Sequence, residues 1–181
     1  RLDGTLGEEI VPVTVKGRKG DTVVDADEAI RPEVSAESLS KLRAIGGDDA
    51  THTAGNAPGV NDGAGALVLA SEEWAEANGK EALGTIIAYG QIGDEYACLP
   101  KTPALAALAA LEKVGKTPAD VDIWEVNEAF ASVSLNTIKM LDLDEDKVNV
   151  NGGAVALGHP IGASGARVIG VVVRELQRRG G

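Results

Sequence analysis

The chain has 181 residues with a formal net charge of −11, and 44% of them are hydrophobic although only 3% are aromatic. The acidic charge argues against nucleic acid and anionic membranes as partners, and no apolar run reaches the length of a membrane span. The single Cys98 excludes an internal disulfide and predicts a reducing, cytoplasmic compartment, while the start at Arg1 predicts a piece of a longer protein.

The first fifty residues favour short strands and turns. Residues 10–15 (IVPVTV) and 22–26 (TVVDA) are rich in β-branched side chains and flank a charged Lys-Gly-Arg-Lys-Gly turn at 16–20, which predicts a hairpin. Residues 35–42 predict a short helix that Ser35 caps.

From residue 59 onward the pattern changes to alternating strands and helices, which is typical of an α/β fold. We predict strands at 66–70, 83–89, 121–126 and 148–150. Helices are predicted after the Ser71 cap, from Thr102 and Pro103, from 128 to 141, and from Pro160 to the end at Arg178, Arg179, Gly180 and Gly181. Spacings of three and four predict the buried faces of three of these helices: Ala104, Leu105, Leu108 and Leu111; Phe130, Val133, Thr137 and Met140; and Ala166, Ile169, Val173 and Leu176.

The stretch 151–167 combines five glycines with one of the two histidines of the chain. Pro160 disfavours a helical backbone at His159, so we expect His159 to be extended between a glycine turn and the last helix. The spacing matches neither a P-loop nor a dinucleotide fingerprint. From the residues alone, two interpretations stay open. One is a tight strand-to-helix connection with a satisfied histidine, and the other is a site that binds an anion or a polarised carbonyl.

Three short blocks in this sequence resemble the signature blocks of the thiolases. They are 55–63 (GNAPGVNDG), 127–130 (NEAF) and 158–165 (GHPIGASG), in the order that the family has them. The resemblance implies an α/β, thiolase-like layered fold, a mixed sheet with helices on both faces, truncated at both ends. It implies that residues 1–58 are the end of a loop domain that covers coenzyme A. Residues 59–181 would then be the C-terminal domain without its last strands.

Thiolases make or cleave a carbon–carbon bond between acyl groups held as thioesters, which requires a thiolate, a base and donors for two oxyanions. By resemblance, His159 takes the thiol proton and donates from Nε2 to a thioester oxygen, and Asn127 holds a water in the same oxyanion hole. Asn127 also has the side chain of a helix cap, and both roles are compatible. Because each residue follows a predicted strand, we expect the two to converge at the carboxyl ends of neighbouring strands.

The other reactive side chains are predicted to have structural roles. The resemblance makes Glu128 structural, although it is close to the site. Cys98 matches neither catalytic cysteine of the family, and we expect it to be a small hydrophobic side chain. His52 is predicted to be a loop residue.

The resemblance also implies contacts to a coenzyme A thioester, with no prosthetic group and no metal held by side chains. Four positions match ligand contacts of the family: Arg31, Ser38, Ala54 and Pro58. Pro58 departs from the pattern, in which a serine commonly donates, because proline has neither a hydroxyl nor an N–H. One branch of the family binds potassium through backbone carbonyls that correspond here to residues 54–57 and Val155.

The resemblance implies a fragment of an acyltransferase. Its parent would condense two acetyl-CoA to acetoacetyl-CoA and CoA, or run the reverse thiolysis, through a cysteine acyl-enzyme. A longer-chain 3-ketoacyl-CoA thiolase and a non-catalytic binding or assembly module stay open as alternatives. The expected partners are the remainder of the thiolase subunit and further copies of it in a homo-oligomer of two or four.

Overall fold

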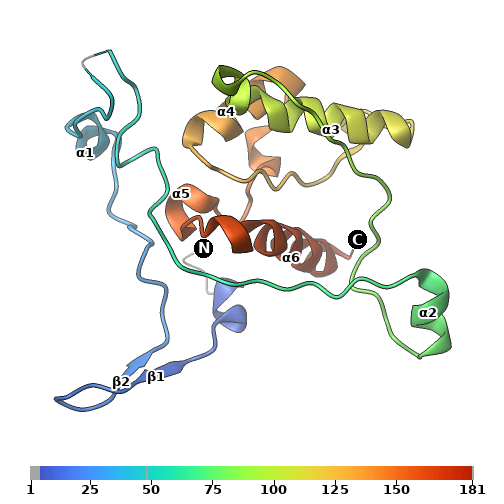
Figure 1. Cartoon of the computed structure of the whole chain (residues 1–181), viewed down its shortest axis with the longest axis horizontal. Helices are drawn as coiled ribbons and strands as arrows, with labels where there is room; N and C mark the ends of the chain where they lie inside the picture. Colours follow the sequence, from blue (N-terminus) through green and yellow to red (C-terminus); the bar gives the residue numbers. More distant parts are fainter. Residues whose placement is uncertain (1–4, 48, 181) are drawn as a thin grey trace.

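The computed structural model describes residues 5–47 and 49–180 (Figure 1). Within these two ranges, none of the helices has the length and apolar composition that a membrane crossing requires. Its elements, with η for a 3-10 helix, are η1 (Thr5–Glu9), β1 (Val13–Val15), β2 (Thr22–Val24), α1 (Ala36–Ser40), α2 (Glu72–Ala77), η2 (Tyr96–Lys101), α3 (Thr102–Lys113), η3 (Pro118–Asp120), α4 (Ala131–Leu141), η4 (Glu145–Lys147), α5 (Ala154–Leu157) and α6 (Ile161–Arg179).

The predicted hairpin and the two predicted helix caps are confirmed. β1 and β2 pair antiparallel, with Val13 opposite Val24, and the hairpin projects from the rest of the chain (Figure 1). The Ser35 side chain accepts from the N–H of Ser38 and begins α1, and the Ser71 side chain begins α2 in the same way. Both strands and α1 are shorter than predicted, because strand pairing is confined to Val13–Val15 and Thr22–Val24 and the helix ends at Ser40.

The strand predictions at 66–70 and 83–89 are wrong in the described part of the chain. The backbone is extended at both places, but neither segment pairs with a neighbouring strand. Val68 is 94% exposed and Leu69 is 73% exposed, so the apolar run is uncovered. An apolar sequence favours a strand, but only the backbone hydrogen bonds of a neighbour make one.

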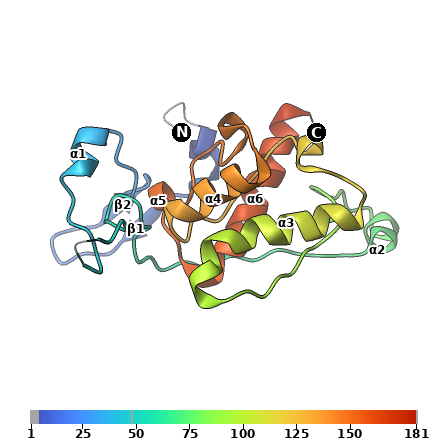
Figure 2. The same ribbon diagram turned by 90° about the horizontal axis from the view of Figure 1, so that it is seen from above.

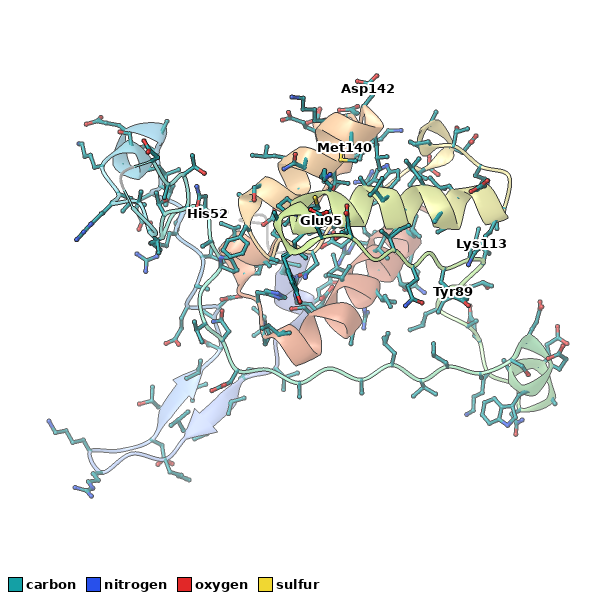
Figure 3. All side chains as sticks on the ribbon, turned by 45° about the horizontal axis from the view of Figure 1, so that its top comes forward. His52, Tyr89, Glu95, Lys113, Met140 and Asp142 are labelled. Atoms are coloured by element: carbon teal, nitrogen blue, oxygen red, sulfur yellow. The ribbon has the colours of Figure 1, made fainter. Side chains whose placement is uncertain are left out.

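The first extended segment runs beside α6 to α2, and the second leads from α2 to α3 (Figure 1). At Gly63 the approach to α6 is so close that a side-chain carbon would lie 2.7 Å from Pro160 Cγ. In the second segment, Lys113 Nζ donates to the carbonyl of Tyr89 at 2.7 Å and lies 4.1 Å from the centre of its ring (Figure 3). The two segments are therefore anchored on the helices rather than on a sheet.

Residues 121–126 and 148–150 do lie side by side, as two parallel strands would. Trp124 and Val148 form a single parallel bridge. The N–H of Trp124 donates to the carbonyl of Lys147, and the N–H of Asn149 donates to the carbonyl of Trp124, both at 2.8 Å. Within residues 5–47 and 49–180, strands pair only at this bridge and in the β1–β2 hairpin.

The core residues come from the segment 121–126 of this bridge and from the helices α3, α4, α5 and α6, which are labelled in Figure 2. The core consists of small and branched side chains, as the low aromatic content predicts: Ala104, Ile123, Val126, Val133, Leu141, Ala154, Ala163 and Val171. On α4 the prediction is half right. Val133 and Thr137 are buried, whereas Phe130 and Met140 are 37% and 40% exposed.

α6 buries a different face from the predicted one. Its buried residues are Ala163, Ser164, Val171 and Glu175, whereas Ile169 of the predicted face is 38% exposed. Val171 and Val173 are two residues apart and so point about 200° apart around the helix. Glu175 is buried because Asn151 and two arginines of the last turn pair with it. The helix ends as predicted at Gly180, with φ 79°, and Gly181 lies outside the described residues.

Candidate active site

The turn that carries His159 begins where residues 148–150 end. The short helix α5 follows, and Gly158 then takes a φ of 95°, a conformation that favours glycine. A side-chain carbon at Gly158 would also lie only 2.6 Å from Oδ1 of Asn61. The same Oδ1 accepts a hydrogen bond from the N–H of His159 at 3.3 Å. Asn61 thus joins the first signature block to the third across 98 residues of sequence.

The imidazole of His159 is oriented by Ser164, in the first turns of α6. The Nδ1 atom lies 2.6 Å from Oγ of Ser164, which is itself 2% exposed. The Ser164 hydroxyl donates its one hydrogen to the carbonyl of Pro160 at 3.0 Å. We therefore assign Nδ1 as the protonated nitrogen, donating to Oγ, with Nε2 as the acceptor. A half-buried imidazole in this tautomer can take a proton at Nε2 and then return it as a hydrogen-bond donor.

The second block approaches the first through its backbone and one ring. The N–H of Ala131 donates to the carbonyl of Asn56 at 2.9 Å. The ring of Phe130 stands edge-on to the ring of His52, with 4.6 Å between ring centres (His52 is labelled in Figure 3). His52 is a half-buried loop residue, as predicted, and it contributes to the contact between the two blocks. The first block therefore contacts His159 of the third block and Ala131, the residue directly after the second block.

Asn127 lies in the loop before α4 rather than at its cap. The helix begins at Ala131 with Phe130 as its N-cap residue, so the predicted start at 128 and the capping role of Asn127 are both wrong. The loop turns early because the N–H of Ala129 donates to the carbonyl of Asn127 at 3.0 Å. Oδ1 of Asn127 is buried and has no hydrogen-bond partner among the described residues. It is therefore available to accept from a water or a ligand.

Asn127 also lines a cavity of about 390 Å³ between η2, α3 and α4. Most of its lining is apolar, including Leu99, Pro103 and Val133, and the other charged or amide side chain is that of Glu125. Burial raises the pKa of Glu125 to about 7, against an opposing effect of Arg167 and with a smaller contribution from Glu128. Both carboxyl oxygens of Glu125 lack a hydrogen-bond partner in the described part of the chain.

The loops after 121–126 and 148–150 are neighbours, as predicted from their strands. Besides the Trp124–Val148 bridge, the side chain of Asn149 accepts from the N–H of Val126 at 2.7 Å and donates to its carbonyl at 3.0 Å. This contact lies one residue before Asn127. The convergence of the Asn127 and His159 side chains on one water-sized site stays a prediction, and the adjacency of their loops supports it.

Glu128 is held in place by hydrogen bonds. Its carboxylate accepts from the Asn149 side chain and from the N–H of Val155, each at 3.0 Å. These contacts fit the structural role predicted for Glu128 better than that of a free general base. Cys98 is half-buried in η2, where its N–H donates to the carbonyl of Glu95 at 2.8 Å.

The four predicted coenzyme A contacts lie in the first part of the chain. Ser38 is on α1, and α1 packs against the turn that contains Ala54, because Leu39 lies against Gly55 of that turn. The hydroxyl of Ser38 donates to the carbonyl of Ser35 at 2.8 Å. Arg31 and Ala54 are exposed and Pro58 is half-buried. Ligand contacts of these four residues, and the domain boundary at 58, stay predictions.

No group of three or more His, Cys, Asp or Glu side chains that could hold a metal ion occurs in residues 5–47 and 49–180. A potassium ion would instead need backbone carbonyls. Of those at 54–57, the carbonyl of Asn56 already accepts from Ala131. A carbonyl oxygen has a second lone pair, so the potassium site stays a prediction that rests on the carbonyls at 54–57 and that of Val155.

Sequence reasoning missed three residues that build this site: Ser164, Asn61 and Asn149. Ser164 lies five residues after His159, in the first turns of a predicted helix, and its hydroxyl could have been considered as a partner for the imidazole. Asn61 is 98 residues from His159, and no periodicity or spacing connects two residues so far apart. Asn149 has φ 47°, a conformation that Asn tolerates, but its two contacts with Val126 follow only from the strand bridge.

Comparisons with known proteins match nearly the whole chain. The family model "Thiolase, N-terminal domain" matches residues 2–73, and "Thiolase, C-terminal domain" matches residues 80–181. An acetyl-CoA acetyltransferase of Chromobacterium violaceum is 49% identical over 178 residues, which are 98% of this chain and 45% of that protein.

Two crystal structures are similar along 99% of this chain and 45% of their own chains. The acetyl-CoA acetyltransferase of Bacillus anthracis superposes with a TM-score of 0.90 and 44% identity. Human mitochondrial 3-ketoacyl-CoA thiolase superposes with a TM-score of 0.86 and 39% identity. These similarities confirm the predicted layered α/β fold class. The chain spans about half the length of the curated relatives it matches.

Proposed function

The chain belongs to the thiolase family, and we propose that it supplies His159 and Asn127 to the active site of an acetyl-CoA acetyltransferase. The observation that carries this proposal is the oriented imidazole. Its Nδ1 is paired with Ser164 at 2.6 Å, and the backbone N–H of the same histidine is paired with Asn61 of the first block.

In the proposed reaction, Nε2 of neutral His159 takes the proton of a cysteine thiol that lies outside this chain. The thiolate attacks the thioester carbonyl carbon, and the carbonyl π electrons move onto its oxygen. The imidazolium Nε2–H and a water held by Asn127 then donate to that oxyanion. When the carbonyl re-forms, the C–S bond to coenzyme A breaks, the acyl group stays on the cysteine, and the Nε2 proton passes to the leaving thiolate. Donors aimed at a developing oxyanion typically lower the barrier by about 3 to 4 kcal/mol each. The Nδ1–Ser164 contact stays in place throughout, so the ring need not turn between the two steps.

We propose that the ligand is a coenzyme A thioester and that Arg31, Ser38 and Ala54 contact it. The packing of α1 on the turn at 53–56 supports this, because it brings Ser38 and Ala54 onto adjacent elements. The flat guanidinium of Arg31 is exposed and can stack on a base or meet a phosphate. Pro58 would only shape the path of the ligand. The partners in this proposal are the remainder of the subunit and other subunits of a homo-oligomer.

The test completes the subunit. The chain is joined to the residues of the Chromobacterium violaceum relative that it does not match, and thiolysis of acetoacetyl-CoA is measured. The matched variants are His159→Ala and His52→Ala, which remove the two histidines of the chain one at a time. We expect turnover in the completed protein, lost by about two to three orders of magnitude in His159→Ala and largely kept in His52→Ala. A completed, folded protein without turnover would support the non-catalytic module instead.

A longer-chain 3-ketoacyl-CoA thiolase is the second candidate. The similarity to human mitochondrial 3-ketoacyl-CoA thiolase, at a TM-score of 0.86, favours it over unrelated activities. The same completed protein decides between the two by comparing kcat/KM for acetoacetyl-CoA with kcat/KM for longer 3-ketoacyl-CoA substrates. A ratio that favours the longer chains would overturn the acetoacetyl-CoA assignment and leave the roles of His159 and Asn127 intact.

A further inference from the structure

We propose that Glu128 is a positioning residue whose carboxylate ties the loop carrying Asn127 to the turn that leads to His159. The two loops belong to different strand-to-helix connections, and the backbone bridge between Trp124 and Val148 joins these connections before the loops begin. The roles of Asn127 and His159 rest on the proposed function. The connection that Glu128 makes between the two loops can be tested without measuring activity.

The first observation is the set of donors around the carboxylate. Oε1 of Glu128 accepts from Nδ2 of Asn149 at 3.0 Å, and Oε2 accepts from the N–H of Val155 at 3.0 Å. Oγ of Ser134 lies 3.4 Å from Oε1 but also donates to the carbonyl of Ala131 at 3.0 Å, so its contact with Glu128 is the weaker one. Each carboxyl oxygen therefore has one firm donor from the neighbouring connection.

The second observation is the space at Gly153. A side-chain carbon built there would lie 2.2 Å from Cδ of Glu128, and 2.3 Å and 2.5 Å from its two oxygens. Gly153 is buried, so the carboxylate occupies the volume that a side chain of the turn would otherwise fill. The backbone of the turn closes directly on the carboxylate, which lets the Val155 N–H reach it.

The third observation is the use of Asn149. Its Oδ1 accepts from the N–H of Val126, and its Nδ2 donates both to the Val126 carbonyl and to Glu128. Both amide hydrogens of Nδ2 are thereby used. The side chain of Asn149 continues the strand pairing from Trp124 to Val126, next to Asn127. Glu128 extends this connection to Val155.

This arrangement requires a carboxylate. The two firm partners are both donors, so the group between them must accept on both sides. Gln has the same shape but offers one acceptor and one NH₂ group, so one donor would face another donor. Glu128→Gln is therefore expected to release one side of the tie while leaving the packing almost unchanged.

The first experiment uses the 181-residue chain and needs no activity. Amide hydrogen exchange at Val155 and the NMR resonances of the His159 ring are measured in Glu128→Gln. We expect exchange at Val155 to become at least about tenfold faster and the ring resonances to shift. The control is Glu125→Gln, three residues away, which removes a half-buried carboxyl without a hydrogen-bond partner in the described chain. Unchanged exchange and ring resonances in Glu128→Gln would overturn the proposal.

Two substitutions that change the space around the carboxylate, Gly153→Ala and Glu128→Ala, test the proposal if Glu128→Gln fails to fold. Gly153→Ala places a methyl group where the carboxylate lies and should lower the unfolding midpoint. Glu128→Ala vacates that place, so Gly153→Ala should be far less harmful in the Glu128→Ala background. Additive effects of the two substitutions would contradict the seating of the carboxylate at Gly153.

The second experiment uses the completed subunit. Glu128→Gln is expected to lower kcat by about ten- to a hundredfold and to leave KM for CoA within about threefold, because it displaces reacting groups without touching the nucleotide. The control is Glu112→Gln, on the exposed side of α3. An inactive completed wild type would count against the proposed function, whereas the exchange and steric results on the chain would still decide the role of Glu128. Equal kcat in Glu128→Gln and Glu112→Gln would overturn the positioning role.

Discussion

Glu175→Gln is expected to lower the free energy of unfolding by about 2 kcal/mol at pH 7. Glu175 is 3% exposed on α6, and the hydrogen bond from Asn151, followed by those from Arg179 and Arg178, lowers its pKa from 4.5 to about 2. Each pH unit between folded and unfolded pKa values is worth about 1.4 kcal/mol, so the lowering corresponds to roughly 3 kcal/mol. We reduce this to about 2 kcal/mol because the Arg178 and Arg179 side chains are 30% and 45% exposed, where water and salt screen them.

The pH dependence follows from the sign of the pKa change. The folded pKa lies below the unfolded one, so the stabilisation is complete above about pH 4.5 and is lost as the pH falls toward 2. Urea unfolding of wild type and Glu175→Gln is measured at pH 7, 4.5 and 3. We expect a difference of about 2 kcal/mol at pH 7 that narrows at pH 3. Glu112→Gln, on an exposed side of α3, is the control and should match wild type at every pH.

Two results would refute this reasoning. A Glu175→Gln variant as stable as wild type at pH 7 would mean that desolvation cancels the ion pairs. If wild type and Glu175→Gln still differed by the full amount in free energy of unfolding at pH 3, the loss would not come from the charge of Glu175. It would then come from the hydrogen-bonding groups of Gln, which differ from those of a protonated carboxyl. Either result would also remove the physical reason given for the burial of this face of α6.

Three further predictions concern single groups. Burial raises the pKa of Glu125 from 4.5 to about 7, so the folded state holds a proton there and its stability falls as the pH rises between these values. Glu125→Gln should therefore stabilise the chain by about 1 kcal/mol at pH 8 and by little at pH 4.5. The value at pH 8 is reduced because the group is half-buried. Equal gains in free energy of unfolding at both pH values, measured by urea unfolding, would contradict this. The chain alone should not thiolyse acetoacetyl-CoA, and activity that vanished in Cys98→Ala would show that view of Cys98 to be wrong. In the completed subunit, His159→Ala should lower kcat by about a hundred- to a thousandfold while calorimetry finds CoA binding within about threefold of wild type; the reverse pattern would make His159 a ligand contact.

Local chemistry in the sequence predicted several parts of this structure correctly. Ser35 and Ser71 begin helices because a hydroxyl satisfies backbone N–H groups that lie within three residues of it. The adjacency of 121–126 and 148–150 could be expected because successive strands of an α/β pattern often pair. The three signature blocks identified the family, and the first of them contacts His159 of the third.

Only the tertiary structure decided which groups each segment faces. The apolar runs at 66–70 and 83–89 favour strands, but a strand exists only where another backbone supplies its hydrogen bonds. α6 buries Glu175 against the expectation from hydrophobic spacing, because Asn151 lies close enough to compensate the loss of water. The tautomer of His159 depends on Ser164 and on the carbonyl of Pro160, whose directions follow from the helix start. Hydrophobic spacing reports which side chains avoid water, whereas the pairing of buried polar groups depends on distances that exist only after the chain has folded.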